Sequence, residues 1–325
     1  MKKAFAVVFA LSLASMVFAQ SETPRHQRPE AGPDDGIGAE TLKKFPINPV
    51  GDGAIRPMLD EDELPIAANR RFAVAPEALR AAPLAVNLTY HGGDVINVAK
   101  VVCIFWGPTW ASGGSDNSRA TTIQSFRNQL GTSSHYSMLT QYYDSAYIQT
   151  SNLAGTQSDW FDTTNPLPSS GNVTDATVQA EVKRYVAGHG TNYSTVYEVF
   201  LPKYVPGTST LVYSSDGSST SCGGPGLAYC AYHSSYYNGS SYVKYSIEPY
   251  PSCSGCQVSG WTIVQNMTHF MVHETREAVS DPNGNAWYDA SGYEADDKCA
   301  WTGLFISGGY GYQPEWSNAA GGCVQ

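Results

Sequence analysis

The apolar segment AKVVCIFWG, residues 99–107, is the feature that most restricts the fold of this chain. The segment is short and rich in β-branched and aromatic residues, which is typical of a buried strand. A buried strand needs other elements that pack against it. The rest of the sequence must therefore supply helices and further strands around it.

Two amphipathic helices are predicted after this strand. Ile123, Phe126 and Leu130 stand at helical spacing, and Ser115 or Asp116 precedes them as a candidate N-cap. The segment DATVQAEVKRYVAGHG, residues 175–190, predicts a second helix that is stopped by its glycines, Gly188 and Gly190.

Further strands are predicted at residues 195–202, 227–236 and 242–250, and Asn238-Gly239 between the last two is a hairpin signal. A long helix is predicted at residues 260–280. Strands and helices in this order indicate an α/β or α+β fold in which helices flank one mixed central sheet.

Three regions differ in composition along the chain. Residues 1–19 contain two lysines, an apolar stretch and a small-residue cleavage site, which together predict a secretory signal peptide. Residues 20–86 are rich in Pro, Gly and charged residues without periodicity, and predict a flexible leader or pro-segment. Within it, Asn69-Arg70-Arg71 is either a processing site or a charged patch in a linker. Residues 87–325 are predicted to form a single domain.

The charge of the chain excludes some partners. Charged residues make up only 15% of the sequence and the formal net charge is −10, so the clustered cations that neutralise nucleic-acid phosphates are lacking. No segment after the signal peptide approaches the roughly 20 apolar residues of a membrane helix. We therefore expect a secreted protein, extracellular or periplasmic, with no nucleic-acid partner and no membrane span.

Seven cysteines in an exported chain predict disulfides and an oxidising compartment. Their local spacing favours three pairs: Cys222 with Cys230, Cys253 with Cys256, and Cys299 with Cys323. Cys103, within the apolar strand, is then left as a buried thiol.

The helix predicted at residues 260–280 contains most of the candidate chemistry. At about 100° per residue, one face collects apolar residues that would pack on the sheet, namely Val264, Met267, Met271 and Ala278. His269, His273 and Glu277 follow one another at intervals of four residues on another face, so their side chains can converge. Asp281-Pro282 is expected to end the helix.

His273-Glu274-x-x-Glu277 has the layout of the zinc-peptidase helix motif. In that motif two ligands one turn apart bind the metal, and the glutamate after the first ligand acts as general base on the metal-bound water. Glutamate in place of the second histidine can bind zinc but makes the site more tolerant of calcium or manganese. The alternative is a solvated polar face in which Glu274, Arg276 and Glu277 form ion pairs. Apolar residues on both sides of His273 favour burial, which is costly for such charges unless a cation compensates them.

The loop after the helix is rich in oxygen ligands, which would suit calcium or a third zinc ligand. Asp281 and Asn283 are equally well explained as caps of their own turn. Glu294 and Asp297, next to the expected disulfide at Cys299, are the preferred loop ligands. Asp281 remains a candidate additional site residue.

Two more histidines are candidates. His233, on the predicted strand before the hairpin, is either a ligand presented by an edge strand or a half-buried histidine bonded to backbone. His269 is either an extra ligand or a partly buried helix residue.

Several segments resemble a known family. LTYHGGDVINVAKVVCIFWG resembles the opening YHNGPLL...I.LIWYG of the plant EXORDIUM, or phosphate-induced, proteins. The segment around Cys230 and His233 is similar to their GFC...CGTHGS, and PSCSGCQ, with Cys253 and Cys256, is similar to their CPGQCAW. The resemblance covers roughly residues 88–324.

The closing segment, from His273 to Trp301, is more similar to exported bacterial and fungal relatives that read SHELAEAVTDP...NAWYD.SG.E.GDKCAW. The matching positions are His273, Glu274, Glu277, Ala278, Asp281, Pro282, the residues 285–289, Gly292, Glu294, Asp297 and Cys299. The plant proteins lack the His-Glu pair, so their roles in growth signalling are not carried over. The resemblance to the bacterial relatives implies an EXORDIUM-like domain with a zincin-like metal helix.

From these observations we expect an exported metal-dependent hydrolase, in particular a zinc peptidase that acts on an extracellular peptide or a cell-wall polymer. His273 and Glu277, with Glu294 or Asp297, would hold the zinc, and Glu274 would be the catalytic base. One alternative is a non-catalytic, calcium-stabilised protein associated with cell walls or carbohydrate. A second alternative is a purely structural polar helix without an ion. The sequence contains no nucleophile elbow and no phosphate-binding loop.

Overall fold

The computed structural model describes the backbone of residues 43–46 and all of residues 86–216 and 219–325. The chain divides into two compact units, Met1–Ile37 and Gly38–Gln325, and every described residue belongs to the second. The predicted signal peptide, most of the predicted leader and Asn69-Arg70-Arg71 lie outside the described residues.

A six-stranded mixed sheet forms the centre of the described unit, as predicted. Its strand order is β1-β8-β9-β6-β3-β4. The strands from β4 to β9 pair in parallel, whereas β8 runs antiparallel to β9 and β1 antiparallel to β8. The bounds are β1 Lys43–Pro46, β3 Lys100–Trp106, β4 Trp160–Asp162, β6 Thr195–Phe200, β8 Tyr229–Tyr237 and β9 Tyr242–Glu248. The apolar run therefore forms β3, an inner strand, and the hairpin predicted at Asn238-Gly239 joins β8 to β9.

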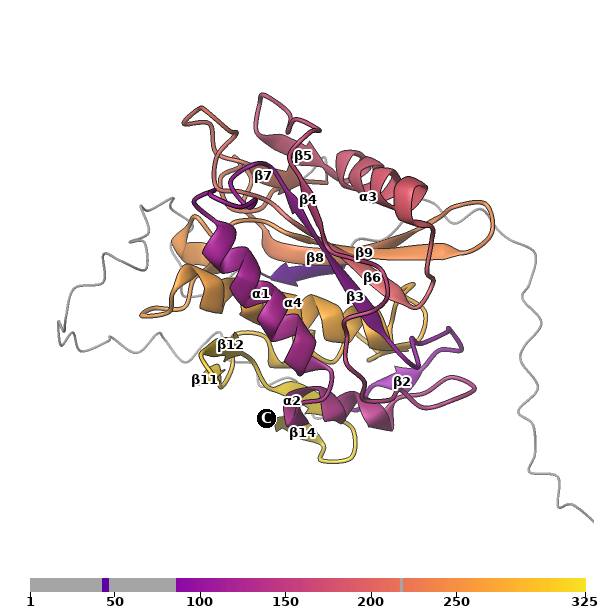
Figure 1. Ribbon diagram of the computed structural model, residues 1–325. Helices are drawn as coiled ribbons and strands as arrows, with labels where there is room; N and C mark the ends of the chain where they lie inside the picture. Colours follow the sequence, from indigo (N-terminus) through magenta and orange to yellow (C-terminus); the bar gives the residue numbers. More distant parts are fainter. Residues whose placement is uncertain (1–42, 47–85, 217–218) are drawn as a thin grey trace, which may run out of the picture. The chain divides into compact units, whose positions relative to one another are not determined.

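Helices cover both faces of the sheet (Figure 1). One face packs against α1 (Asn117–Leu130) and α4 (Ile263–Ser280), and the other packs against α3 (Asp175–His189). Strand β3 contributes side chains to the apolar core on each face of the sheet. Val101, Cys103 and Phe105 lie in the core with α1 and α4, and the residues between them lie in the core with α3.

The two sheet faces differ in polarity beside α4. On the α3 side, β6, β8 and β9 contribute apolar and tyrosine side chains such as Tyr197, Tyr232 and Tyr245. Because side chains alternate along a strand, the opposite face receives the intervening residues. These include Glu198, His233 and Glu248, all of them buried.

The helix boundaries largely follow the predicted signals. Helix α1 begins after Asp116, although that side chain makes no capping hydrogen bond. Helix α3 runs through Gly188, the first of the two predicted stop residues, and ends at the second, Gly190, whose positive φ of 76° favours glycine. Helix α4 begins with a capping box in which Thr262 and Gln265 exchange hydrogen bonds, and it ends at Asp281 as expected.

Shorter elements surround this frame. They are β2 (Thr89–Tyr90) with β10 (Trp287–Tyr288), β5 (Asn172–Thr174) with β7 (Tyr213–Ser215), β11 (Phe305–Ser307) with β12 (Tyr310–Tyr312), β13 (Glu315–Ser317) with β14 (Gly322–Val324), the short helix α2 (Ser134–Ser137), and the 3-10 helices η3 (Met138–Gln141), η4 (Ser254–Cys256) and η5 (Asp297–Cys299). None of the helices in the described part of the chain combines the length and apolar character needed to cross a bilayer.

Six cysteines form three disulfides, but two of the predicted pairings are wrong. Cys299 pairs with Cys323 as predicted, and Cys103 is buried and free. Cys222 instead pairs with Cys253, and Cys230 with Cys256. Cys253 directly precedes the single 3-10 turn η4 and Cys256 is its last residue, and the turn directs each sulfur to a different cysteine of the preceding segment. The two bonds therefore tie η4 to the chain that enters β8.

Candidate metal centre

Helix α4 places His273, Glu274 and Glu277 at its buried centre. These three residues are at most 1% exposed, which is unusual for ionisable groups. Helix α4 is enclosed on nearly every side, since Gln265 is its only residue that is not buried. Met267, Met271 and Ala278 lie in the apolar core with Val101 and Cys103, as the helical spacing predicted.

His273 and Glu277, one turn apart, converge. The Nε2 atom of His273 lies 3.0 Å from Oε2 of Glu277 and 3.7 Å from Oδ1 of Asp297. The backbone N–H of Asp297 donates to the other oxygen of Glu277, with an N···O distance of 2.8 Å. Two residues of the helix and one residue of η5 thus meet at one point.

His233 approaches the same point from β8. Its Nδ1 atom lies 3.1 Å from Oε2 of Glu274 and 3.9 Å from Oε2 of Glu277. Its Nε2 atom lies 3.7 Å from Oε1 of Glu294. The strand therefore joins the helix to the loop residue Glu294, which the sequence had marked as a preferred loop ligand.

Two groups of candidate ligands result, and they share Glu277. One contains His233, Glu277 and Glu294, and the other contains His273, Glu274 and Glu277. Within each group the ligand atoms lie within 4.8 Å of one another, and all the residues are buried. Asp297 lies at the edge of these groups, with a side chain that is 18% exposed. We refer to the six residues together as the acid-imidazole cluster: His233, His273, Glu274, Glu277, Glu294 and Asp297.

Arg276 holds the loop of Glu294 and Asp297 against α4. Its guanidinium donates to both carboxylate oxygens of Asp296 and also to the backbone oxygen of Gln313. The Gln313 amide donates in turn to the backbone and side-chain oxygens of Asp296, at 2.8 and 3.0 Å. Because Arg276 and Asp296 are both buried, this connection fixes the residue directly before Asp297.

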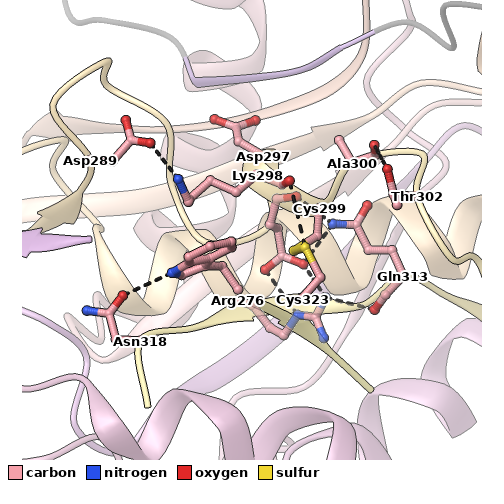
Figure 2. The surroundings of a disulfide bond; sticks show 12 residues. Arg276, Asp289, Asp297, Lys298, Cys299, Ala300, Thr302, Gln313, Asn318 and Cys323 are labelled. Atoms are coloured by element: carbon pink, nitrogen blue, oxygen red, sulfur yellow. Dashed lines mark hydrogen bonds and ion pairs between the residues drawn. A yellow bond between two sulfur atoms is a disulfide. The ribbon is translucent and has the colours of Figure 1, made fainter. Parts of the chain in front are cut away.

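The disulfide between Cys299 and Cys323 ties η5 to strand β14 on the other side of this loop (Figure 2). Lys298, between Asp297 and Cys299, donates to Asp289 with an Nζ···O distance of 2.7 Å and lies 4.5 Å from the centre of the Trp316 ring. The loop is therefore fixed by a covalent bond, by an ion pair and by the Arg276 connection.

Burial dominates the electrostatics of the cluster. It raises the pKa of Glu274 well above its usual value, and the neighbouring carboxylates of Glu277, Glu248, Asp297 and Glu294 raise it further. Burial also lowers the pKa of His273, which favours the neutral imidazole. Beneath the helix, burial raises the pKa of Glu248, with a contribution from Glu198.

Two of the candidate additional residues lie in other interactions. His269 Nε2 lies 3.0 Å from Oε1 of Gln313, and burial lowers the pKa of this histidine to about 3. Asp281 accepts a hydrogen bond of 2.6 Å from the backbone N–H of Ala286, the turn-capping arrangement that was the alternative for this residue. Neither belongs to either of the two histidine-containing ligand groups described above.

Sequence reasoning missed several residues around the cluster. Glu198 and Glu248 lie on the sheet face below α4, and Thr275 donates to Glu198 at 2.5 Å. Strand alternation in YVKYSIE would have placed Glu248 on the face opposite to Tyr245. Gln313 carries no comparable local signal, because its partners are distant in sequence.

No family model matches this sequence, and no curated protein and no solved structure matches it either.

Proposed function

We propose that this protein is an exported metal-dependent hydrolase of the zinc-peptidase type, with its metal in the acid-imidazole cluster. The observation that carries the proposal is the convergence of His273 Nε2 and Glu277 Oε2 at 3.0 Å, with His233 and Glu294 in the same buried cluster. Burying several carboxylates together is costly, and a bound cation offsets that cost.

The chemistry of the donor atoms supports zinc more than calcium. Two imidazoles and several carboxylates form the cluster, and zinc accepts both nitrogen and oxygen ligands. Calcium takes six to eight oxygen ligands and no imidazole in its usual sites. Glu277, which belongs to both ligand groups, would be the central ligand, with His273, His233 and Glu294 as its partners.

Glu274 is suited to hold a proton. Its Oε1 atom is buried and has no hydrogen-bond partner among the described residues, while Oε2 lies against His233. Its raised pKa makes the carboxylate a stronger base than that of an exposed glutamate. Zinc bound in the cluster would supply Lewis-acid polarisation of a carbonyl group. Glu274 would take the proton of the attacking water.

The order of elements supports the same proposal by analogy at the level of the fold. The antiparallel hairpin of β8 and β9 precedes the helix with the HExxE motif, with only the short 3-10 helix η4 between them, and this resembles the order of elements in a zincin. The resemblance to exported bacterial relatives of the EXORDIUM proteins points the same way. The three disulfides fit an oxidising compartment and thereby support export.

Elemental analysis of the protein, purified without chelator, tests the metal. We expect about one zinc per chain, and a loss of at least tenfold in zinc content in His273→Ala. Glu181→Gln is the matched control, because it removes a buried acid from α3, on the opposite side of the sheet, and should retain zinc. Calcium in place of zinc would support the structural alternative, and no metal in the folded protein would refute both metal roles.

The variant Glu274→Gln tests catalysis separately from binding. We expect it to retain zinc and the unfolding midpoint, since the amide has the same shape. Its rate of hydrolysis of a mixture of unstructured peptides, followed by mass spectrometry, should fall by about 100- to 10,000-fold. An unchanged rate would remove Glu274 from the proposed mechanism.

A further inference from the structure

Strand β1 lies on the outer edge of β8, beside the acid-imidazole cluster. Residues 43–46 pair antiparallel with β8, with Lys43 opposite His233 and Pro46 opposite Tyr229. The register shifts between Phe45 and Pro46. Proline has no N–H to donate to a ladder, which explains why the pairing ends there. These four residues lie within the segment predicted as a leader, far in sequence from the domain that they join.

The edge of β8 is a natural acceptor of an extended chain. Its other side is occupied by β9, so β8 would be the last strand of the sheet without β1. An uncovered edge strand presents unpaired N–H and C=O groups that recruit another extended segment. Such strand addition uses main-chain hydrogen bonds and is therefore tolerant of sequence.

This edge adjoins the chemistry of the proposed function. His233 is the β8 residue opposite Lys43, and its ring contacts Glu274 and Glu294. Strand β1 also contacts α4, and its unlabelled indigo arrow lies between β8 and α4 (Figure 1). The backbone of any segment bound along β8 would thus pass next to His233 and the helix that carries Glu274.

We propose that the outer edge of β8 is the binding site for an extended peptide substrate, and that residues 43–46 occupy it in the uncleaved chain. The inference rests on the proposed function, because it assigns the substrate and the latency of that same site. The occupant is a peptide backbone, which identifies the ligand class as an unstructured polypeptide segment bound antiparallel to β8.

Covalent attachment explains why so short a strand can hold this edge. Residues 47–85 join β1 to the rest of the domain, and a tethered segment has an effective concentration on the order of 1 mM. A cut within residues 47–85, such as at Asn69-Arg70-Arg71, turns this contact into a bimolecular one. The cut segment can then dissociate and leave the edge of β8 open to another peptide, because the tether no longer returns it to the same place.

A peptide-binding measurement tests the proposal on the full chain. The probe is a fluorescent synthetic peptide with the sequence of residues 39–50, and the readout is fluorescence anisotropy. A specific protease site placed at residues 69–71 allows the leader to be cut in the folded protein and removed by gel filtration. We expect at least tenfold tighter binding of the peptide after the cut. Equal affinity before and after the cut, or no binding after it, would overturn the proposal.

A paired variant tests the same point without a cut. Lys44→Pro with Phe45→Pro removes two N–H groups from β1 and leaves the domain unchanged, so the intact variant should bind the peptide as the cut protein does. Ala67→Pro with Ala68→Pro is the control elsewhere in the leader and should bind as weakly as the original chain. Failure of the β1 variant to gain affinity would count against residues 43–46 as the occupant.

Zinc content, measured on the same samples, separates this proposal from the proposed function. Peptide binding that depends on the cut in a protein without zinc would retain the edge site and reject the metal role. A full complement of zinc with no peptide binding after the cut would retain the metal role and reject the edge site.

Discussion

Helix α4 carries two buried ionic clusters that are constructed differently. In the first, Arg276 lies among acids: it donates to Asp296, and its Nε atom is 3.7 Å from Glu315. In the second, carboxylates of α4, η5 and the loop before it meet two imidazoles, and burial favours the neutral form of His273. One cluster thus contains a permanent cation of the chain itself. The other is built from the side chains that bind metal ions.

The difference separates two uses of buried charge. A buried ion pair with good geometry fixes a loop without any ligand, and Arg276 does this for the segment before Asp297. A buried cluster of acids and imidazoles is costly by itself and depends on protons or on a bound cation. We therefore expect the two clusters to respond differently to mutation, to chelators and to pH.

The largest effect should come from Arg276→Met. The substitution leaves Asp296 and Glu315 buried without their cation, which should lower the free energy of unfolding by about 3–5 kcal/mol. Urea denaturation followed by circular dichroism measures the loss. The same loss should appear with and without chelator, because Arg276 belongs to the chain.

Arg276→Lys is the matched control. It keeps the charge but not the two parallel hydrogen bonds to Asp296, so we expect an intermediate stability. A loss below about 1 kcal/mol in Arg276→Met would contradict a supporting role for this cluster.

Removal of the metal should have the next largest effect. If zinc binds the folded chain, free zinc at about 100 times its Kd stabilises that chain by about 2.7 kcal/mol, and EDTA should abolish this increment. Thermal unfolding with EDTA and after addition of zinc measures it. His273→Ala should show no zinc-dependent increment, whereas Glu181→Gln should show all of it. Equal responses of the two variants would place the bound zinc elsewhere.

The smallest effect concerns a third group of buried acids, on the α3 side of the sheet. Burial, with the hydrogen bond to Asp162, raises the pKa of Glu181 to about 8, so the folded chain keeps a proton there. Burial alone would raise the pKa of Asp162 as well, but hydrogen bonds from Glu181, Asn165 and Thr164 lower it to about 2. These acids are accommodated by a shared proton and by Arg184, which donates to Glu181.

The sign of the pH dependence follows from the raised pKa of Glu181. The stabilising contribution is complete below the ordinary glutamate pKa of about 4.5, and it is lost as the pH rises through about 8. Glu181→Gln cannot release this proton. Between pH 5 and pH 7, the free energy of unfolding of Glu181→Gln should therefore decrease by about 1 kcal/mol less than that of the original chain. Denaturation curves recorded at both pH values measure this difference. Parallel pH profiles would show that Glu181 does not hold the proton.

Local sequence signals predicted the elements well. The apolar run of β3, the Asn238-Gly239 turn and the C-terminal end of α4 depend on neighbouring residues, and the structure has each of them. The convergence of His273 and Glu277 could also be predicted, because helical geometry places residues four apart on one face. Of the two glycines predicted to stop α3, Gly190 ends the helix, whereas Gly188 stays within it, because one glycine costs a helix only about 1 kcal/mol.

Contacts between distant segments could not be predicted. His233 reaches Glu274 only because β8 lies beside α4, and nothing in its own neighbourhood in the sequence indicates that contact. The pairing of Cys222 with Cys253 likewise depends on where η4 is placed against the chain before β8. Arg276 was considered as a partner of Glu274 and Glu277, but it donates instead to Asp296, which follows it by 20 residues.

The nearly complete enclosure of α4 restricts the substitutions that this helix can accept. A helix with a solvent face can accept substitutions on that face, but here 17 residues of the 18-residue helix are already buried in the interior. New specificity would have to arise in the strand edge and the loops around the helix, while the helix itself stays the same.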